Sequence, residues 1–188
     1  FAVDGSTRAV AAIETALPSF EKREQSEAAD ASSAALAAFG PKTVPFLKER
    51  IPGVLPVQAA WLTRVLAAIG GPEGTEALRE QLQNRWADVR LAAVEGLASV
   101  GGPGDAPSLI RMLKDEEWPV RRAAADALGR HKSAKAVGPL IDLFGDPNVY
   151  VRASAQEALT AITGERFPDD KAWRAWLAAN PQPEEGGP

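Results

Sequence analysis

The sequence is marked first by the residue types that it lacks. Its 188 residues contain no cysteine, one methionine and one histidine. The absence of cysteine excludes disulfides, thiolate nucleophiles and cysteine-ligated metals. The single histidine, His131, cannot build a histidine-rich metal centre. We therefore expect no bound metal and no other cofactor.

An excess of positive charge and long apolar runs are also missing. The formal net charge is -4, which gives no general attraction to phosphate, so we expect no nucleic-acid binding. No apolar run approaches the roughly 20 residues that cross a bilayer, so we expect no membrane insertion. The sequence does not determine the cellular compartment, and we favour the cytoplasm. Because the sequence starts at Phe1, export followed by removal of a signal peptide is the alternative.

What the sequence does have is an internal repeat. A Val-Arg pair recurs every 31 residues, at 89–90, 120–121 and 151–152, and a Gly-Pro pair keeps the same period at 40–41, 71–72 and 102–103. Such a period is typical of an array of one structural unit in which each unit packs on its neighbours.

Each unit contains two amphipathic helices. Ala106, Leu109 and Leu113 follow the spacing of one buried helical stripe, and Val120 and Leu128 define a second stripe shortly after it. Both stripes recur at the repeat period, and alanine, a strong helix former, dominates both segments. The Gly-Pro pairs are expected to end the second helices, since glycine accepts a left-handed conformation and proline cannot continue a helix.

The expected fold is therefore all-α. We predict a right-handed α-solenoid of about five antiparallel helix pairs with a C-terminal capping helix. A single domain is expected over 1–180, with a degenerate first pair at 1–39, regular repeats at 40–164 and a cap at 165–180 that carries Trp173 and Trp176. The last residues, 181–188, are rich in proline, glycine and glutamate, and we expect them to be disordered.

The segments DEEWPVRRAAADALGRH (115–131) and DPNVYVRASAQEALTAI (146–162) resemble HEAT repeats, in particular the short bacterial type also found in phycobilisome lyases. The resemblance covers about residues 40–164. It implies that the second helices line a concave face, and that an Asp in the turn and an Arg six residues later link neighbouring units. Asp115 with Arg121 and Asp146 with Arg152 match this ladder. The pair of Asn84 and Arg90 departs from it because Asn84 carries no charge.

The exposed side of the second helices is the candidate binding surface. Projection at about 100° per residue places Arg122, Asp126 and Gly129 opposite the buried stripe. Trp118 falls close to this side and could anchor a partner, because tryptophan offers a large contact area. An ordinary solvated face would also explain the charges. The predicted partner-binding residues are Arg64, Glu95, Trp118, Arg122, Asp126 and Glu157.

Catalytic interpretations find little support. The His-Glu pairs of HEAT-like deoxyhypusine hydroxylases and the cationic inner surface of HEAT-like DNA glycosylases are both missing, and the basic turn of Arg130, His131, Lys132 and Lys135 is interpreted as solvated. The resemblance implies binding or scaffolding more often than catalysis. We therefore predict a non-catalytic interaction module whose partner is a protein or peptide, basic in character, bound along the concave face.

The alternative is an enzyme-associated or bilin-lyase-like subunit that binds a small planar ligand in the concavity. A closed, aromatic-lined pocket would favour this alternative, and an open groove would favour a peptide or protein. The sequence leaves the oligomeric state open.

Overall fold

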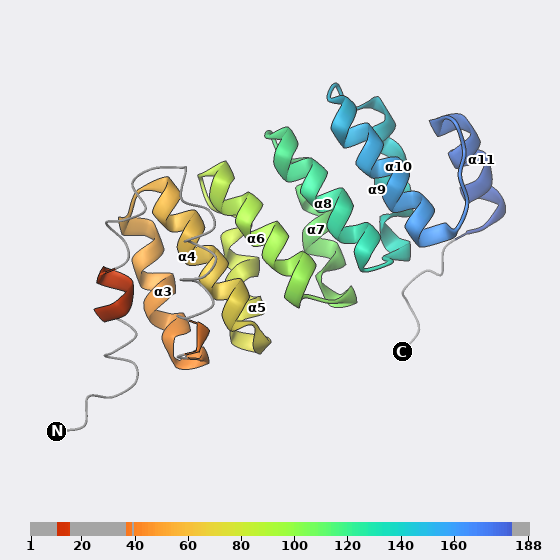
Figure 1. The fold of residues 1–188 in the computed structure, drawn as a ribbon. Coiled ribbons are helices and arrows are strands. Elements are labelled where there is room, and N and C mark those ends of the chain that lie inside the picture. The colour runs from red at the N-terminus through yellow and green to blue at the C-terminus, as the bar shows by residue number, and fades with distance from the viewer. Residues whose placement is uncertain (1–10, 16–36, 39, 182–188) are drawn as a thin grey trace. The chain divides into compact units, whose positions relative to one another are not determined.

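A computed structural model describes residues 11–15, 37–38 and 40–181, and these residues form helices and connecting turns with no strand among them (Figure 1). The chain divides into two compact units, Phe1–Gly101 and Gly102–Pro188. Most of the predicted first pair at 1–39, and the predicted tail beyond Pro181, lie outside the described residues. The all-α expectation is confirmed.

Between residues 40 and 101, the first unit contains two helix pairs. After a 3₁₀ turn at Pro41–Thr43, α3 (Val44–Arg50) and a second 3₁₀ turn (Ile51–Gly53) lead into α4 (Pro56–Ile69), and α5 (Gly71–Gln81) leads into α6 (Ala87–Val100). Helices α4 and α6 pack along each other, and α5 packs against both. The predicted stripes form the core, since Leu62, Leu78 and Leu97 are fully buried.

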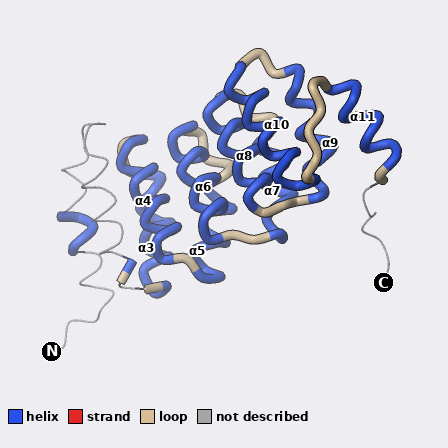
Figure 2. The backbone as a smooth tube through the Cα atoms, turned by 45° about the vertical axis from the view of Figure 1, so that its right-hand side comes forward, coloured by secondary structure: helices blue, strands red, loops and turns tan. Residues whose placement is uncertain are grey.

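The second unit repeats this plan. A 3₁₀ turn (Pro103–Asp105) precedes α7 (Ala106–Met112), which is paired with α8 (Trp118–Arg130). A 3₁₀ turn (Ala134–Ala136), α9 (Val137–Asp142) and another 3₁₀ turn (Leu143–Gly145) precede α10 (Val149–Thr163), and α11 (Asp170–Ala179) follows. Helix α8 packs along α10, and α11 packs on α9 (Figure 2). The boundaries agree with the apolar periodicity of the sequence.

The Gly-Pro pairs begin helices as much as they end them. Gly70 ends α4 with φ 61°, as expected for a terminating glycine. Gly102, in contrast, has an extended backbone with φ -153°, so the left-handed expectation is wrong at that position. Pro72 and Pro103 both stand in the first turn of the next element, where a missing N–H costs nothing.

Gly129 lies between two helices instead of on the exposed surface. A Cβ atom at this position would come within 2.9 Å of Ala158 Cα on α10. The projection that placed Gly129 on the binding face is therefore wrong. The absence of a side chain lets α8 and α10 approach closely, and periodicity within one helix carries no information about this contact.

The predicted C-terminal helix is present as α11. Asp169 caps its first turn, with Oδ1 2.8 Å from the amide nitrogen of Ala172. Trp173 is fully buried, and Phe167 meets its ring edge-to-face at 4.8 Å between centroids. Trp176 makes a second edge contact with Trp173 at 5.9 Å. A small aromatic cluster thus anchors the helix, and an ion pair between Arg174 and Asp142 at 2.8 Å also holds it.

Candidate partner-binding surface

The turn before each second helix is closed by the residue at the predicted ladder position. Asn84, Asp115 and Asp146 each accept a hydrogen bond from the main-chain N–H two residues later. Their Oδ1 atoms lie 3.1, 2.9 and 2.8 Å from the amide nitrogens of Trp86, Glu117 and Asn148. Asparagine serves this turn as well as aspartate does. We did not assign this turn-closing role from the sequence. The Asp or Asn that recurs just before each second helix is the sequence feature that indicates it.

The arginine six residues later closes the same turn from the other side. Arg90, Arg121 and Arg152 donate from Nη1 to main-chain carbonyl oxygens instead of to the side chain at the ladder position. The acceptors are the carbonyl oxygens of Asn84, Asp115 and Asp146, at 3.0, 2.8 and 2.7 Å. The neutral Asn84 therefore does not interrupt this pattern.

The charge pairing of the ladder differs from the prediction. Arg121 forms a bidentate contact with Asp146, one repeat further on, with Nε–Oδ2 2.7 Å and Nη2–Oδ1 3.1 Å. The expected hydrogen-bonded pairing of Arg121 with the Asp115 carboxylate is corrected accordingly, since Arg121 Nη1 donates to the carbonyl oxygen of Asp115. The parallel course of α8 and α10 explains the shift, because it brings the guanidinium opposite the next turn.

This ion pair is largely buried, with side-chain exposures of 13% for Arg121 and 5% for Asp146. Burial alone would raise the pKa of Asp146, but the hydrogen bonds from Arg121 and Asn148, together with the charges of Arg121 and Arg152, outweigh burial, and the pKa lies below its ordinary value. The hydrogen bond to Asp146 raises the pKa of Arg121. Because the pair is enclosed, it links α8 to the turn before α10 and is not accessible to a ligand.

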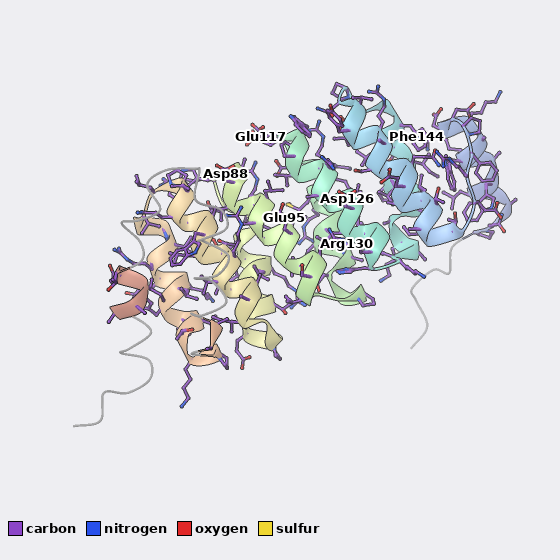
Figure 3. All side chains as sticks on the ribbon, in the orientation of Figure 1. Asp88, Glu95, Glu117, Asp126, Arg130 and Phe144 are labelled. Carbon is purple, nitrogen blue, oxygen red and sulfur yellow. The ribbon has the colours of Figure 1, made fainter. Side chains whose placement is uncertain are left out.

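In the second unit, the predicted binding residues lie on the accessible side of α8 and α10. Trp118, Arg122 and Glu157 are exposed, and Asp126 is half-buried. Figure 3 shows Asp126 midway along α8, with Glu117 at the start of that helix. Arg122 Nε lies 3.8 Å from Asp126 Oδ2, so these two charges partly compensate each other.

The first unit carries Arg64 on α4 and Glu95 on α6, both exposed. Figure 3 places Glu95 midway along α6. Glu95 belongs to one unit, and Asp126 and Glu157 belong to the other. A continuous acidic row through all three carboxylates therefore stays a prediction.

The aromatic residues near the starts of the second helices have different environments. Trp61 is buried at 1% exposure and belongs to the core. Trp86 is half-buried, and the guanidinium carbon of Arg85 lies 4.3 Å from the centre of its ring. Trp118 and Tyr150 stack on each other at 5.8 Å with 30° between their planes, while remaining 38% and 58% exposed. Only tertiary packing separates core aromatics from accessible ones.

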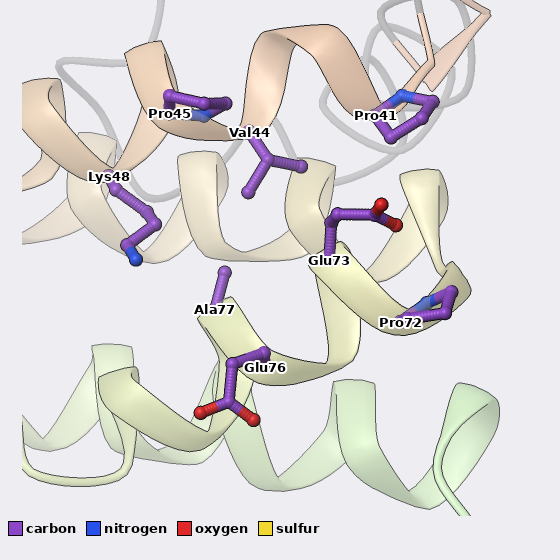
Figure 4. A pocket seen from close by; sticks show the side chains of 8 residues that line it. All are labelled: Pro41, Val44, Pro45, Lys48, Pro72, Glu73, Glu76 and Ala77. Carbon is purple, nitrogen blue, oxygen red and sulfur yellow. The ribbon is translucent and has the colours of Figure 1, made fainter.

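A groove of about 600 Å³ runs between α3 and α5 of the first unit (Figure 4). Its lining residues are Pro41, Val44, Pro45, Lys48, Pro72, Glu73, Glu76 and Ala77. Lys48 also forms an ion pair with Glu80 at 2.7 Å. The groove is open and contains no aromatic residue, and it lies on the first helices instead of the predicted surface.

The remaining features of the described residues point to no metal site and no membrane span. Within residues 11–15, 37–38 and 40–181, no group of His, Asp and Glu side chains could hold a metal, and no helix is long and apolar enough to cross a bilayer. Arg130, Lys132 and Lys135 are exposed, whereas both ring nitrogens of His131 are buried without a hydrogen-bond partner in this part of the chain.

Paired helices, stripes repeated at a fixed period and Arg-clamped turns define an α-helical repeat protein. The family profile for HEAT repeats matches residues 56–120 and 106–172, and the chain belongs to the HEAT-repeat family. A search of curated proteins finds no match to this chain.

Several solved structures share the fold. The complex of CpcE and CpcF of phycocyanin lyase from Nostoc sp. PCC7120 contains a chain that is 26% identical, with TM-score 0.64, covering 79% of this chain and 98% of that one. Human deoxyhypusine hydroxylase in complex with glycerol is 21% identical, with TM-score 0.57, covering 86% and 67%. An engineered protein is 21% identical, with TM-score 0.56, covering 86% and 75%.

Proposed function

We propose that this protein is a non-catalytic interaction module that binds a protein or peptide through the exposed face of its second helices. The observation that carries the proposal is the stacked, solvent-accessible pair of Trp118 and Tyr150 at the starts of α8 and α10. Large aromatic side chains lose little conformational entropy when they are covered, and they dominate the energetics of many interfaces.

The surroundings of the pair favour a polypeptide ligand. Arg122, Asp126 and Glu157 continue the accessible face along α8 and α10, where they could act as a polar rim around an aromatic anchor. The similar phycocyanin lyase structure is itself a complex of two chains, CpcE and CpcF, which supports partner binding as the use of this fold.

A second candidate is an enzyme-associated subunit that binds a small planar ligand, and the 26% identity to a phycocyanin lyase chain favours it. Ligand pockets usually enclose most of a small molecule and are lined by aromatic and apolar groups. The groove between α3 and α5 is open and has no aromatic lining residue, so its character favours a polypeptide. Titration with a linear tetrapyrrole, followed by visible absorbance, tests this candidate directly.

The proposed function is tested with a surface variant that combines Glu95→Lys, Asp126→Lys and Glu157→Lys. All three side chains are accessible, so the helical circular-dichroism spectrum should be unchanged. A partner is first identified by photocrosslinking from position 126 in extracts of the source cells. Its affinity for the variant should fall by about tenfold or more, which corresponds to about 1.4 kcal/mol.

The control is charge reversal of the basic turn at Arg130, Lys132 and Lys135, which are all exposed. This control should bind like the parent protein. If the partner binds the triple Lys variant normally and loses affinity for the control, the proposed surface is wrong.

A further inference from the structure

We propose that the Trp118–Tyr150 pair receives an arginine side chain of the partner, with Glu117 as the carboxylate that completes the site. This inference rests on the proposed function and names the chemistry of the segment that is bound. Both rings are accessible, and the two stack on each other at 5.8 Å. The stacked pair therefore offers aromatic faces at a defined place on the second unit.

The protein already contains an example of the contact that we propose. In the first unit, the guanidinium of Arg85 lies 4.3 Å from the ring centre of Trp86, which is the N-cap residue of α6. The negative face of an indole ring attracts a cation at such a distance. A guanidinium and an aromatic face can thus pair at the start of a second helix of this fold.

In the second unit, Glu117 is the N-cap residue of α8, one repeat after Trp86, and Trp118 follows it as the first residue of the helix. Glu117 is exposed, and its negative charge also acts on Arg121 of the same unit. Figure 3 shows Glu117 at the start of α8. A carboxylate near an aromatic face would attract a cation through its charge, and the ring would add an attraction through its quadrupole.

The nearby arginines of the same unit have other contacts. Arg121 is bound to Asp146, and Arg152 donates to the carbonyl oxygen of Asp146 at 2.7 Å. Arg122 lies 3.8 Å from Asp126. These three guanidinium groups are therefore held by oxygen atoms of their own unit, and the proposed guanidinium belongs to the partner.

The N-termini of α8 and α10 do not exclude a cation at the aromatic pair. A helix N-terminus favours anions because its first N–H groups are unpaired. Here Asp115 accepts the N–H of Glu117, and Asn148 accepts the N–H of Tyr150, at 2.9 Å in each case. These contacts satisfy main-chain donors next to the aromatic pair, and Arg85 shows that a cation is tolerated at the equivalent end of α6.

Arginine suits this site better than lysine does. Its planar guanidinium can lie flat on an aromatic ring while its edge donates to a carboxylate. A lysine ammonium is a strongly hydrated point charge that cannot make both contacts in one plane. We therefore expect the site to prefer an arginine-bearing segment over a lysine-bearing segment of equal charge.

The probe is a fluorescein-labelled Arg-Gly-Ser repeat peptide, with lysine and citrulline versions as matched ligands, measured by fluorescence anisotropy. The parent protein should bind the arginine peptide more tightly than the lysine peptide, and the citrulline peptide should not bind. Combining Trp118→Leu with Tyr150→Leu removes both aromatic faces and should weaken binding of the arginine peptide by about tenfold. Glu117→Gln should weaken binding and reduce its salt dependence.

Trp86→Leu is the matched control, since its ring is already covered by Arg85 and the change should leave peptide affinity unaltered. Circular dichroism confirms that each variant remains folded. Equal binding of the arginine and citrulline peptides, no binding of any peptide by the parent, or full binding by the double leucine variant would each overturn the proposal.

Failure of this inference can be distinguished from failure of the proposed function. If the crosslinked partner is lost in the triple Lys variant but the arginine peptide does not bind the parent, the interaction surface stands and the arginine site is wrong. If the triple Lys variant binds the partner normally, the proposed function fails first.

Discussion

Arg121 on α8 holds Asp146 of the following repeat with two hydrogen bonds, at 2.7 and 3.1 Å, while its third nitrogen closes the turn of its own repeat. A single side chain thus joins the closure of one turn to the position of the next. This arrangement makes Arg121 the residue through which the stacking of the two pairs can be tested.

Replacing Arg121 with alanine should lower the free energy of unfolding by about 2 to 4 kcal/mol, because the change leaves the Asp146 carboxylate buried without its guanidinium. Urea unfolding measures the loss. Arg152→Ala is the control, since Arg152 donates to main-chain carbonyl oxygens, and this change should cost about 1 kcal/mol. Equal losses in the two variants would show that the contact between Arg121 and the Asp146 carboxylate adds nothing to the free energy of unfolding.

The Arg121–Asp146 pair should also make stability depend on pH in the acid range. The pKa of Asp146 in the folded protein lies below its ordinary value of 3.8, so its contribution is fully present above that pH and is lost as the pH falls through the folded pKa. Urea midpoints of the parent and of Asp146→Asn, measured between neutral pH and about pH 2, should therefore converge at low pH. A constant difference between them would contradict the linkage.

Trp173 should dominate the stability of the C-terminal helix. It has no exposed surface, so Trp173→Ala should cost about 3 to 5 kcal/mol through the cavity that it leaves. Trp176 is half-buried, and Trp176→Ala should cost clearly less. Thermal unfolding distinguishes the two. Similar melting temperatures would mean that α11 contributes little to the fold, and deletion of 164–188 would then also be tolerated.

Gly129 should resist even the smallest side chain. An added Cβ would lie 2.9 Å from Ala158 Cα, so Gly129→Ala must move α8 away from α10. We expect a net loss of about 1 to 3 kcal/mol from overpacking, although alanine favours a helix over glycine by about 1 kcal/mol. Gly104→Ala is the control, since nothing lies within 4 Å of its added Cβ. A stabilised Gly129→Ala variant would show that the helix contact relaxes freely.

The helices themselves were predictable from sequence because their signal is local. The stripe of Val120 and Leu128 repeats with the period of an α-helix, and both residues are buried in α8. The repeat of 31 residues likewise indicates an array of helix pairs, and the segments 115–131 and 146–162 resemble HEAT repeats. Amphipathic spacing determines both which segments are helical and which side of each faces the core.

Contacts between helices were not predictable in the same way. Trp61 in α4 and Trp118 in α8 both belong to second helices, yet one is 1% exposed and the other 38%. The helical projection places Gly129 on the surface, whereas the structure places it against Ala158 of α10. Such differences depend on the neighbouring helix, whose distance and rotation no single-helix pattern contains.

By itself, the sequence determined the repeat, the helical class, the positions of the helices and the exposure of residues such as Glu157. The tertiary structure alone decided that Arg121 pairs with Asp146 instead of with the Asp115 carboxylate, and that Trp118 stacks on Tyr150. The physical reason is the distance along the sequence between the residues that interact. Helix formation and amphipathicity depend on residues a few positions apart, whereas ion pairs and ring contacts depend on where packing places residues that lie a whole repeat apart.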